Sequence, residues 1–169
     1  MIHQISHNQR SWMSAVASVT GGGTFEALRK LGFAPGWEPH WMSASAKPAR
    51  PDPRVAEAQD VPEYDDHGPG LLCLTREPHS SLFVAREEGP FAGHVWLHVA
   101  GGVGGLYDLF VPEDLRRRGL GSALSRAAMS RAGELGVDTI AMHAAAPALY
   151  ESLGFRSRGH GRTWWRHLH

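Results

Sequence analysis

The chain has 169 residues, 42% hydrophobic and 20% charged, which is enough for one domain of ordinary size plus a short appendage. Its 17 basic residues are balanced by 17 acidic ones, whereas a nucleic-acid-binding protein normally carries a basic excess. All apolar stretches are shorter than the ~18 residues that a membrane-spanning helix needs. The lone cysteine, Cys73, fits a reducing compartment. We therefore expect a soluble, cytoplasmic protein that binds neither nucleic acid nor membranes.

The first 45 residues predict an N-terminal appendage built from short helices and extended structure. Helices are expected over residues 9–19 and 25–31, the second ending at Gly32 as a glycine C-cap. Pro35 and Pro39 limit the next segment to loop or edge strands. Residues 46–61 are rich in proline and predict a linker or surface strap, so the main domain is expected over residues 62–169.

Beyond the linker, the hydrophobic pattern predicts mostly strands, with one long helix. A short helix is expected over 65–74, although glycines and a proline weaken it. Strands are expected over 81–86 and 91–99, a third ends at Val111, and a helix runs from Gly119 to Gly136. The remaining expected elements are a strand over 137–143, a short helix over 148–153, and closing strands over 155–158 and 163–167.

Two short segments of the chain resemble each other. Residues 25–33 and 147–155 both read as a helix that ends in Leu-Gly-Phe, and each is followed by a turn and a tryptophan-bearing segment. Two independent short helices would explain the match. The alternative is a decayed duplication of the end of the main domain.

The stretch from residue 103 to residue 122 has the features of an anion-binding site. An apolar strand ends at Val111, three arginines follow, and Gly119 and Gly121 open the long helix. A helix start offers unpaired N–H groups and the positive end of the helix dipole, and glycines allow a phosphate to approach the backbone. Because the overall charge is balanced, one compact anion fits better than a polymer of phosphates. No Gly-x-Gly-x-x-Gly or Gly-Lys-Ser/Thr motif supports a dinucleotide or nucleoside triphosphate.

Two motifs in this order resemble the GNAT superfamily of acyl-CoA-dependent N-acetyltransferases. They are Arg116-Arg-Arg-Gly-Leu-Gly121 and Leu149-Tyr-Glu-Ser-Leu-Gly-Phe155. The resemblance implies an α+β fold with a central twisted mixed sheet flanked by helices, and acetyl-CoA as cofactor. It also implies that the main chain of three strand residues, Leu109, Phe110 and Val111, holds the pantetheine arm. The following loop and helix start would hold the pyrophosphate through Arg116, Arg117, Arg118, Gly119, Leu120, Gly121 and Ser122.

The same resemblance suggests how acetyl transfer would be catalysed. Tyr150 is the expected general acid, because a thiol of pKa ~8.5 that leaves as thiolate can take a proton from a phenol of pKa ~10, or be stabilised by it. His143 is the expected base, and Asp108, His94 and His98 are alternatives. His94 and His98 share a strand face, but no carboxylate or cysteine cluster accompanies them, so no metal is expected.

The acceptor site is expected to combine carboxylates with aromatic side chains, which suits a cationic small molecule with a primary amine. We take an aminoglycoside-type antibiotic as the acceptor, in resistance or self-protection; an amino-acid-like toxin, a polyamine or a peptide N-terminus are alternatives. The alternative of a different class is that the protein binds acyl-CoA as a sensor and catalyses no reaction. Exposed tryptophans and the appendage favour a homodimer. The expected acceptor residues are Asp65, Asp66, Trp96, Asp108 and Trp164.

Overall fold

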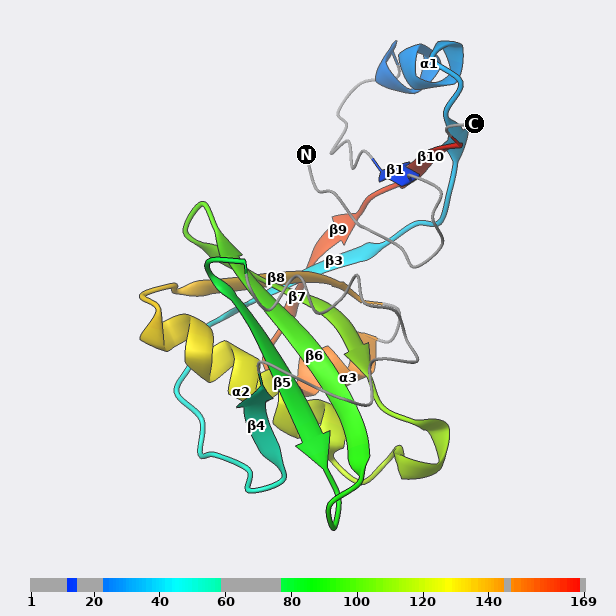
Figure 1. Ribbon diagram of the computed structural model, residues 1–169. Helices are drawn as coiled ribbons and strands as arrows, with labels where there is room; N and C mark the ends of the chain where they lie inside the picture. The colour runs from blue at the N-terminus through cyan, green and yellow to red at the C-terminus, as the bar shows by residue number, and fades with distance from the viewer. Residues whose placement is uncertain (1–11, 15–22, 59–76, 145–146, 168–169) are drawn as a thin grey trace.

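The computed structural model describes residues 12–14, 23–58, 77–144 and 147–167, and these residues form a large and a small sheet (Figure 1). The large sheet has seven strands in the order β4-β5-β6-β7-β8-β3-β9, and only β7 and β8 pair in parallel. Its strands are β3 (His40–Ser45), β4 (Val55–Ala58), β5 (Ser80–Arg86), β6 (Phe91–Ala100), β7 (Val103–Phe110), β8 (Thr139–Ala144) and β9 (Arg156–His160). The expected α+β fold with a mixed sheet is confirmed.

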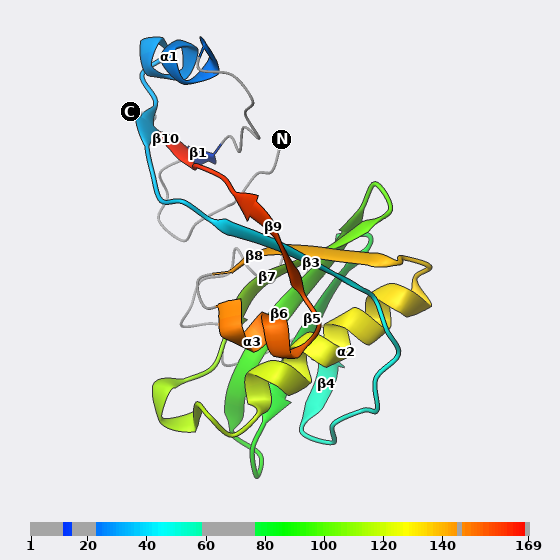
Figure 2. The same cartoon turned by 180° about the vertical axis from the view of Figure 1, so that it is seen from behind.

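One face of the large sheet is covered by the helices α2 (Leu120–Glu134) and α3 (Pro147–Ser152) (Figure 2). Leu120, Leu124 and Ala128 are four residues apart on α2, so they share one helix face, and each is at most 1% exposed. They join the inward side chains of β5, β6 and β7 in the main core. A second cluster of Leu82, Val84 and Trp96 lies on the opposite face.

The small sheet shows that the two halves of the chain exchange strands. Its order is β1 (Trp12–Ser14), β10 (Trp164–His167) and β2 (Ala34–Pro35), all antiparallel, and β1 is linked to β2 through the helix α1 (Gly23–Lys30). In the large sheet, β8 is likewise linked to β9 through α3, and both flank β3. The N-terminal strands β1 and β2 therefore enclose the C-terminal strand β10, and the C-terminal strands β8 and β9 enclose the N-terminal strand β3. The chain runs between the two sheets next to β3 and β9 (Figure 1). This reciprocity supports the duplication hypothesis.

Several elements agree with the sequence and others correct it. The short helix after Gly23, the β5–β6 hairpin, β7, α2, β8 and α3 are confirmed. Residues 12–14 form a strand and not part of a helix, because they pair with β10. The segment that begins near Pro35 and Pro39 was expected to form loop or edge strands, but it contains β3, an interior strand. The linker expected over residues 46–61 contains β4. The final expected strand, β10, lies in the small sheet, whereas the helix expected over 65–74 lies outside the described residues. No described helix is long and apolar enough to cross a membrane.

Candidate active site

The parallel pair β7 and β8 separates part of the way along its length. Hydrogen-bonded pairing runs only from Val103 opposite Thr139 to Gly105 opposite Ala141. At the paired end the Ile140 side chain lies over Gly104, where an added Cβ would be only 2.7 Å from it. Beyond it, β7 continues to Phe110 paired only with β6, and β8 continues to Ala144 paired only with β3. The main chain of residues 106–110 therefore offers an open strand edge, which an extended ligand can complete by adding hydrogen bonds.

The start of α2 lies next to this open edge. Its N-cap, Gly119, has φ +83° and provides no side-chain cap, so the first N–H groups of the helix are left to bind an anion. Arg117 also has a left-handed backbone, with φ +66°, and left-handed residues in a turn direct successive N–H groups into one concavity. A Cβ on Gly121 would lie 3.5 Å from Leu149 and 3.8 Å from Leu109. The structure thus brings the two motifs and β7 together at one point.

The arginines of the loop have different roles. Arg116 donates from Nε to the Val111 carbonyl at 3.1 Å, which fastens the loop to the end of β7. Arg118 forms an ion pair with Glu87 at 2.9 Å and donates to the Asp114 carbonyl, so it ties the loop to the β5–β6 turn. The short 3₁₀ helix η3 (Glu113–Leu115) lies between these contacts. Two of the three guanidinium groups therefore shape the loop, and Arg117 remains exposed to solvent.

A residue outside the motif also contacts the loop formed by residues 116–121. Arg54, from the segment expected to be a linker, donates from Nη1 to the Arg118 carbonyl at 3.2 Å. Its guanidinium is fixed by hydrogen bonds to both carboxylate oxygens of Asp52. These side-chain hydrogen bonds lower the pKa of Asp52 to about 2, so the pair stays ionised at any pH near neutrality. No motif in the sequence pointed to this contact.

Tyr150 lies on α3 with its ring in the main core. Only 7% of the residue is exposed, and its ring meets Phe155 edge-on at a centroid distance of 5.6 Å. Burial raises the pKa of Tyr150 to about 12, because the ionised phenolate would lose its hydration. The hydroxyl therefore remains protonated across the neutral and mildly alkaline range. It can donate a hydrogen bond, but it is a weaker acid than a free phenol.

His143 lies on β8 between two tryptophans. Its ring centroid is 4.9 Å from that of Trp37 and 5.8 Å from that of Trp41, and both contacts are edge-on. Trp41 is its cross-strand partner on β3. Burial lowers the pKa of His143, with a backbone hydrogen bond acting in the opposite direction. The imidazole is therefore neutral at pH 7 and can accept a proton.

Asp108 and His94 form a pair on the face of the sheet that α2 does not cover. Their Oδ2 and Nε2 atoms are 3.2 Å apart, and His94 is buried while the Asp108 side chain is 58% exposed. A bulge adds a residue to β7 opposite β6 in this region, and Asp108 has φ +49°. Simple alternation would turn Asp108 toward α2; the bulge re-aims it toward His94.

His143 and the Asp108–His94 pair share one side of the sheet. Gly105 and Ala141 are register partners, so alternation places Tyr107 and His143 on the same face. Tyr107 packs against the cluster that contains Trp96, opposite the α2 side. The opening between β7 and β8 is thus flanked by the neutral imidazole of His143 on β8 and by Asp108 on β7, which is hydrogen-bonded to His94 on β6.

The expected acceptor residues are not all brought together. Trp96 is 4% exposed and lies two residues from His94 on the same strand face. Trp164 is 1% exposed in the small sheet, where its ring stacks on Phe25 at 5.5 Å, so it has almost no surface for a ligand. Asp65 and Asp66 lie outside the described residues. His98 is hydrogen-bonded with Ser80 at 2.8 Å.

Sequence reasoning missed Trp37 and Trp41, although both follow the first copy of the repeated segment. A tryptophan-bearing segment after each copy was the available signal, but nothing in the sequence showed that these strands are exchanged. The N-terminal segment therefore supplies side chains that surround a candidate base of the main domain.

Comparison with curated proteins identifies relatives over part of the chain. It is 37% identical over 110 residues to the mycothiol acetyltransferase of Clavibacter michiganensis subsp. michiganensis (strain NCPPB 382), which covers 62% of this chain and 31% of that protein. It is 40% identical over 83 residues to the mycothiol acetyltransferase of Clavibacter sepedonicus, covering 46% of this chain and 27% of that protein. The matched part is less than a third of the length of either relative.

Solved structures show the same fold at low sequence identity. A GCN5-related N-acetyltransferase from Sphaerobacter thermophilus superposes with a TM-score of 0.63 at 15% identity, covering 94% of this chain and 60% of that one. A tandem GNAT protein from the clavulanic acid biosynthesis pathway gives a TM-score of 0.59 at 15% identity, covering 92% and 63%. In sequence, residues 40–155 match the Acetyltransferase (GNAT) family, which is more than half of the chain. The chain therefore belongs to the GNAT family of acetyltransferases.

Proposed function

We propose that this protein transfers an acetyl group from acetyl-CoA to the primary amine of a small molecule. The observation that carries the proposal is the open edge of β7 beside the uncapped start of α2. An extended arm that ends in a phosphate anion fits this combination, because the edge pairs with the arm and the helix start binds the anion. Membership of the acetyltransferase family agrees with it.

The residues present fit the coenzyme. The main chain of Leu109 to Val111 would pair with the pantetheine arm, and the N–H groups of residues 117–122 would hold the pyrophosphate. Gly121 leaves the space that a larger residue would occupy between Leu109 and Leu149. When bound, the coenzyme supplies an acetyl thioester.

The chain's own residues would manage the protons of the reaction. In the transfer, the neutral amine nitrogen forms a bond to the acetyl carbon, and the bond between that carbon and sulfur breaks. The nitrogen loses a second proton as the amide forms, and the thiolate takes up a proton to leave as free thiol. An alkylammonium of pKa ~10 must first lose a proton, and His143 would accept it because burial keeps the imidazole neutral at pH 7. Asp108, hydrogen-bonded to His94, would attract and orient the cationic acceptor. Tyr150 would donate a hydrogen bond to the departing thiolate sulfur.

The acceptor class follows from charge and from the relatives. An aminoglycoside-type antibiotic suits a site with a carboxylate and aromatic rings. The names of the relatives favour an acceptor related to mycothiol, and this candidate has the stronger support, since it rests on sequence identity of 37%. A non-catalytic acyl-CoA sensor is the alternative of another class.

The experiment is an acceptor screen with the full 169-residue chain. Acetyl-CoA is mixed with amines that include an aminoglycoside, a polyamine, an amino acid, a peptide N-terminus and a mycothiol-type amine, and free thiol release is followed. We expect release that depends on one acceptor class and that disappears in Gly121→Glu. If coenzyme A raises the melting temperature but no amine releases thiol, the protein is a sensor and the enzymatic proposal is wrong.

A further inference from the structure

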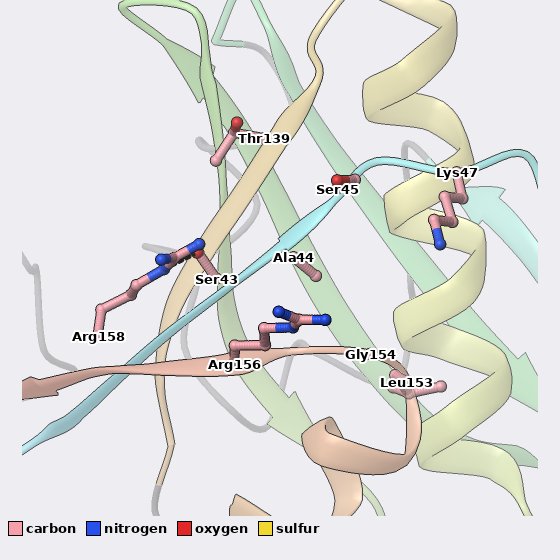
Figure 3. A pocket seen from close by; sticks show the side chains of 9 residues that line it. All are labelled: Ser43, Ala44, Ser45, Lys47, Thr139, Leu153, Gly154, Arg156 and Arg158. Atoms are coloured by element: carbon pink, nitrogen blue, oxygen red, sulfur yellow. Dashed lines mark hydrogen bonds between the residues drawn. The ribbon is translucent and has the colours of Figure 1, made fainter.

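A cavity of about 330 Å³ lies at the edge of the large sheet, where β9 begins and β3 continues past it (Figure 3). The last residue of β3 that pairs with β9 is Ser43, so the rest of β3 has no strand on that side. Figure 3 shows Lys47 and Arg156 pointing into this space from opposite sides. The polar lining side chains are Ser43, Ser45, Lys47, Thr139, Arg156 and Arg158.

The cavity is separate from the opening that we assign to the coenzyme. Thr139 begins β8 and pairs with Ser45, and at this end β8 is also hydrogen-bonded to β7. The opening between β7 and β8 begins only beyond Ala141, toward the other end of the strand. His143 is four residues along β8 from Thr139, which corresponds to ~13 Å in an extended strand. A ligand in the cavity would therefore not occupy the proposed active site.

Three cationic side chains and no acidic residue line the cavity. Lys47, Arg156 and Arg158 make no ion pair with any described carboxylate. Elsewhere in the described chain, five cationic side chains do have acidic partners. These are Lys30 with Glu26, Arg54 with Asp52, Arg118 with Glu87, Arg131 with Glu57 and Glu134, and Arg162 with Glu38. Three cations that share a small volume repel one another, and a bound anion would remove that repulsion.

The side chains are also arranged as donors. Arg158 is held over β3 by a hydrogen bond from its Nε to the Ser43 hydroxyl at 2.6 Å, which orients its guanidinium (Figure 3). Guanidinium groups donate in a planar fork that matches the oxygens of a phosphate, and lysine adds a point charge. The hydroxyls of Ser45 and Thr139 can donate as well.

We propose that this cavity is a second anion-binding site, which takes a phosphate group, free or carried by a small molecule, independently of the coenzyme. Because all three cations are exposed, the affinity is modest and falls with ionic strength. The proposal does not depend on the acetyl transfer, since binding alone tests it.

The test measures binding of inorganic phosphate by titration calorimetry, with saturating coenzyme A present so that the start of α2 is filled. We expect binding to the wild type and at least a tenfold weaker affinity in the double variant Arg156→Gln, Arg158→Gln. The matched control is Arg126→Gln, an exposed arginine on α2 that lies outside the cavity. Lys47→Gln, which changes no strand, is the second variant if the double variant does not fold.

Three results would overturn the proposal: no phosphate binding at low ionic strength, equal loss in Arg126→Gln, or full affinity in both cavity variants. A comparison of coenzyme A with dephospho-coenzyme A adds a fourth result that would overturn it. If the double variant loses the preference for coenzyme A, the cavity holds the 3′-phosphate of the coenzyme and is not a separate site. Glucose 6-phosphate distinguishes the source: tighter binding than inorganic phosphate supports a phosphorylated small molecule, and equal binding supports free phosphate.

Discussion

Replacing Tyr150 with Phe removes one hydroxyl and leaves the packing of the ring unchanged. The ring is buried against Phe155, and its contacts are those of a phenyl group. Among the described residues the hydroxyl has no hydrogen-bond partner, so its loss should change the free energy of unfolding by less than ~1 kcal/mol. Any large effect on turnover would then come from the reaction and not from the fold.

The size of the effect follows from the pKa. Burial raises the pKa of Tyr150 to about 12, whereas a thiol has a pKa of ~8.5. Complete proton transfer from this phenol to the thiolate would be uphill by roughly 5 kcal/mol at ~1.4 kcal/mol per pKa unit. A hydrogen bond to the sulfur is the cheaper route, and one to a charged group is worth about 1.5–3 kcal/mol. Tyr150→Phe should therefore lower kcat by roughly 10- to 150-fold.

The assay is thiol release at saturating acetyl-CoA, together with coenzyme affinity from calorimetry. We expect kcat to fall while the Kd of coenzyme A stays within twofold, and we expect the Tyr150 hydroxyl to cause no loss of wild-type activity below pH ~11. An equal loss of kcat and coenzyme affinity would show that Tyr150 supports the fold of the site. If the kcat of the wild type declined near pH 8.5 and that decline disappeared in Tyr150→Phe, the pKa of Tyr150 would not be raised by burial.

Further predictions concern the coenzyme site, the base and the core. Gly121→Glu should abolish thermal stabilisation by coenzyme A, because its side chain and charge would block the helix start; retained stabilisation would reject the site. Since burial lowers the pKa of His143, the acid limb of kcat/KM should lie below pH ~6.5, move to higher pH in Trp37→Ala and be absent in His143→Gln. Leu124→Ala should cost about 2.7–5 kcal/mol in urea unfolding, and Leu135→Ala, at an exposed position, less than ~1 kcal/mol.

Local patterns in the sequence were sufficient for most elements of the main domain. The spacing of Leu120, Leu124 and Ala128 predicts the buried face of α2, and Gly119 marks its start. The alternation in β6 separates Val95 and Leu97, which face α2, from Trp96 on the other side. These patterns depend on residues close in sequence, so no long-range information was needed to read them.

The geometry of the candidate site depends on contacts that such patterns do not contain. Asp108 meets His94 only because a bulge changes the side to which it points, and the bulge is defined by the pairing of β7 with β6, a separate strand. Arg54 is 64 residues from the carbonyl that it binds. Trp96 and Trp164 have the aromatic chemistry that an acceptor site favours, but burial depends on what packs over a side chain, and both are buried.

The exchange of strands has the largest consequence for function. A proline-bounded segment reads as an edge strand, because prolines remove donors from a ladder; yet Pro39 precedes β3, which pairs on both sides. The pairing of His40 to Ser45 with β8 places Trp41 opposite His143, and the chain leading into β3 brings Trp37 to the same ring. Removing residues 1–45 would therefore remove an interior strand and expose the imidazole to water, raising its pKa. The N-terminal segment is thus part of the candidate active site, and its sequence should be read together with that of the main domain.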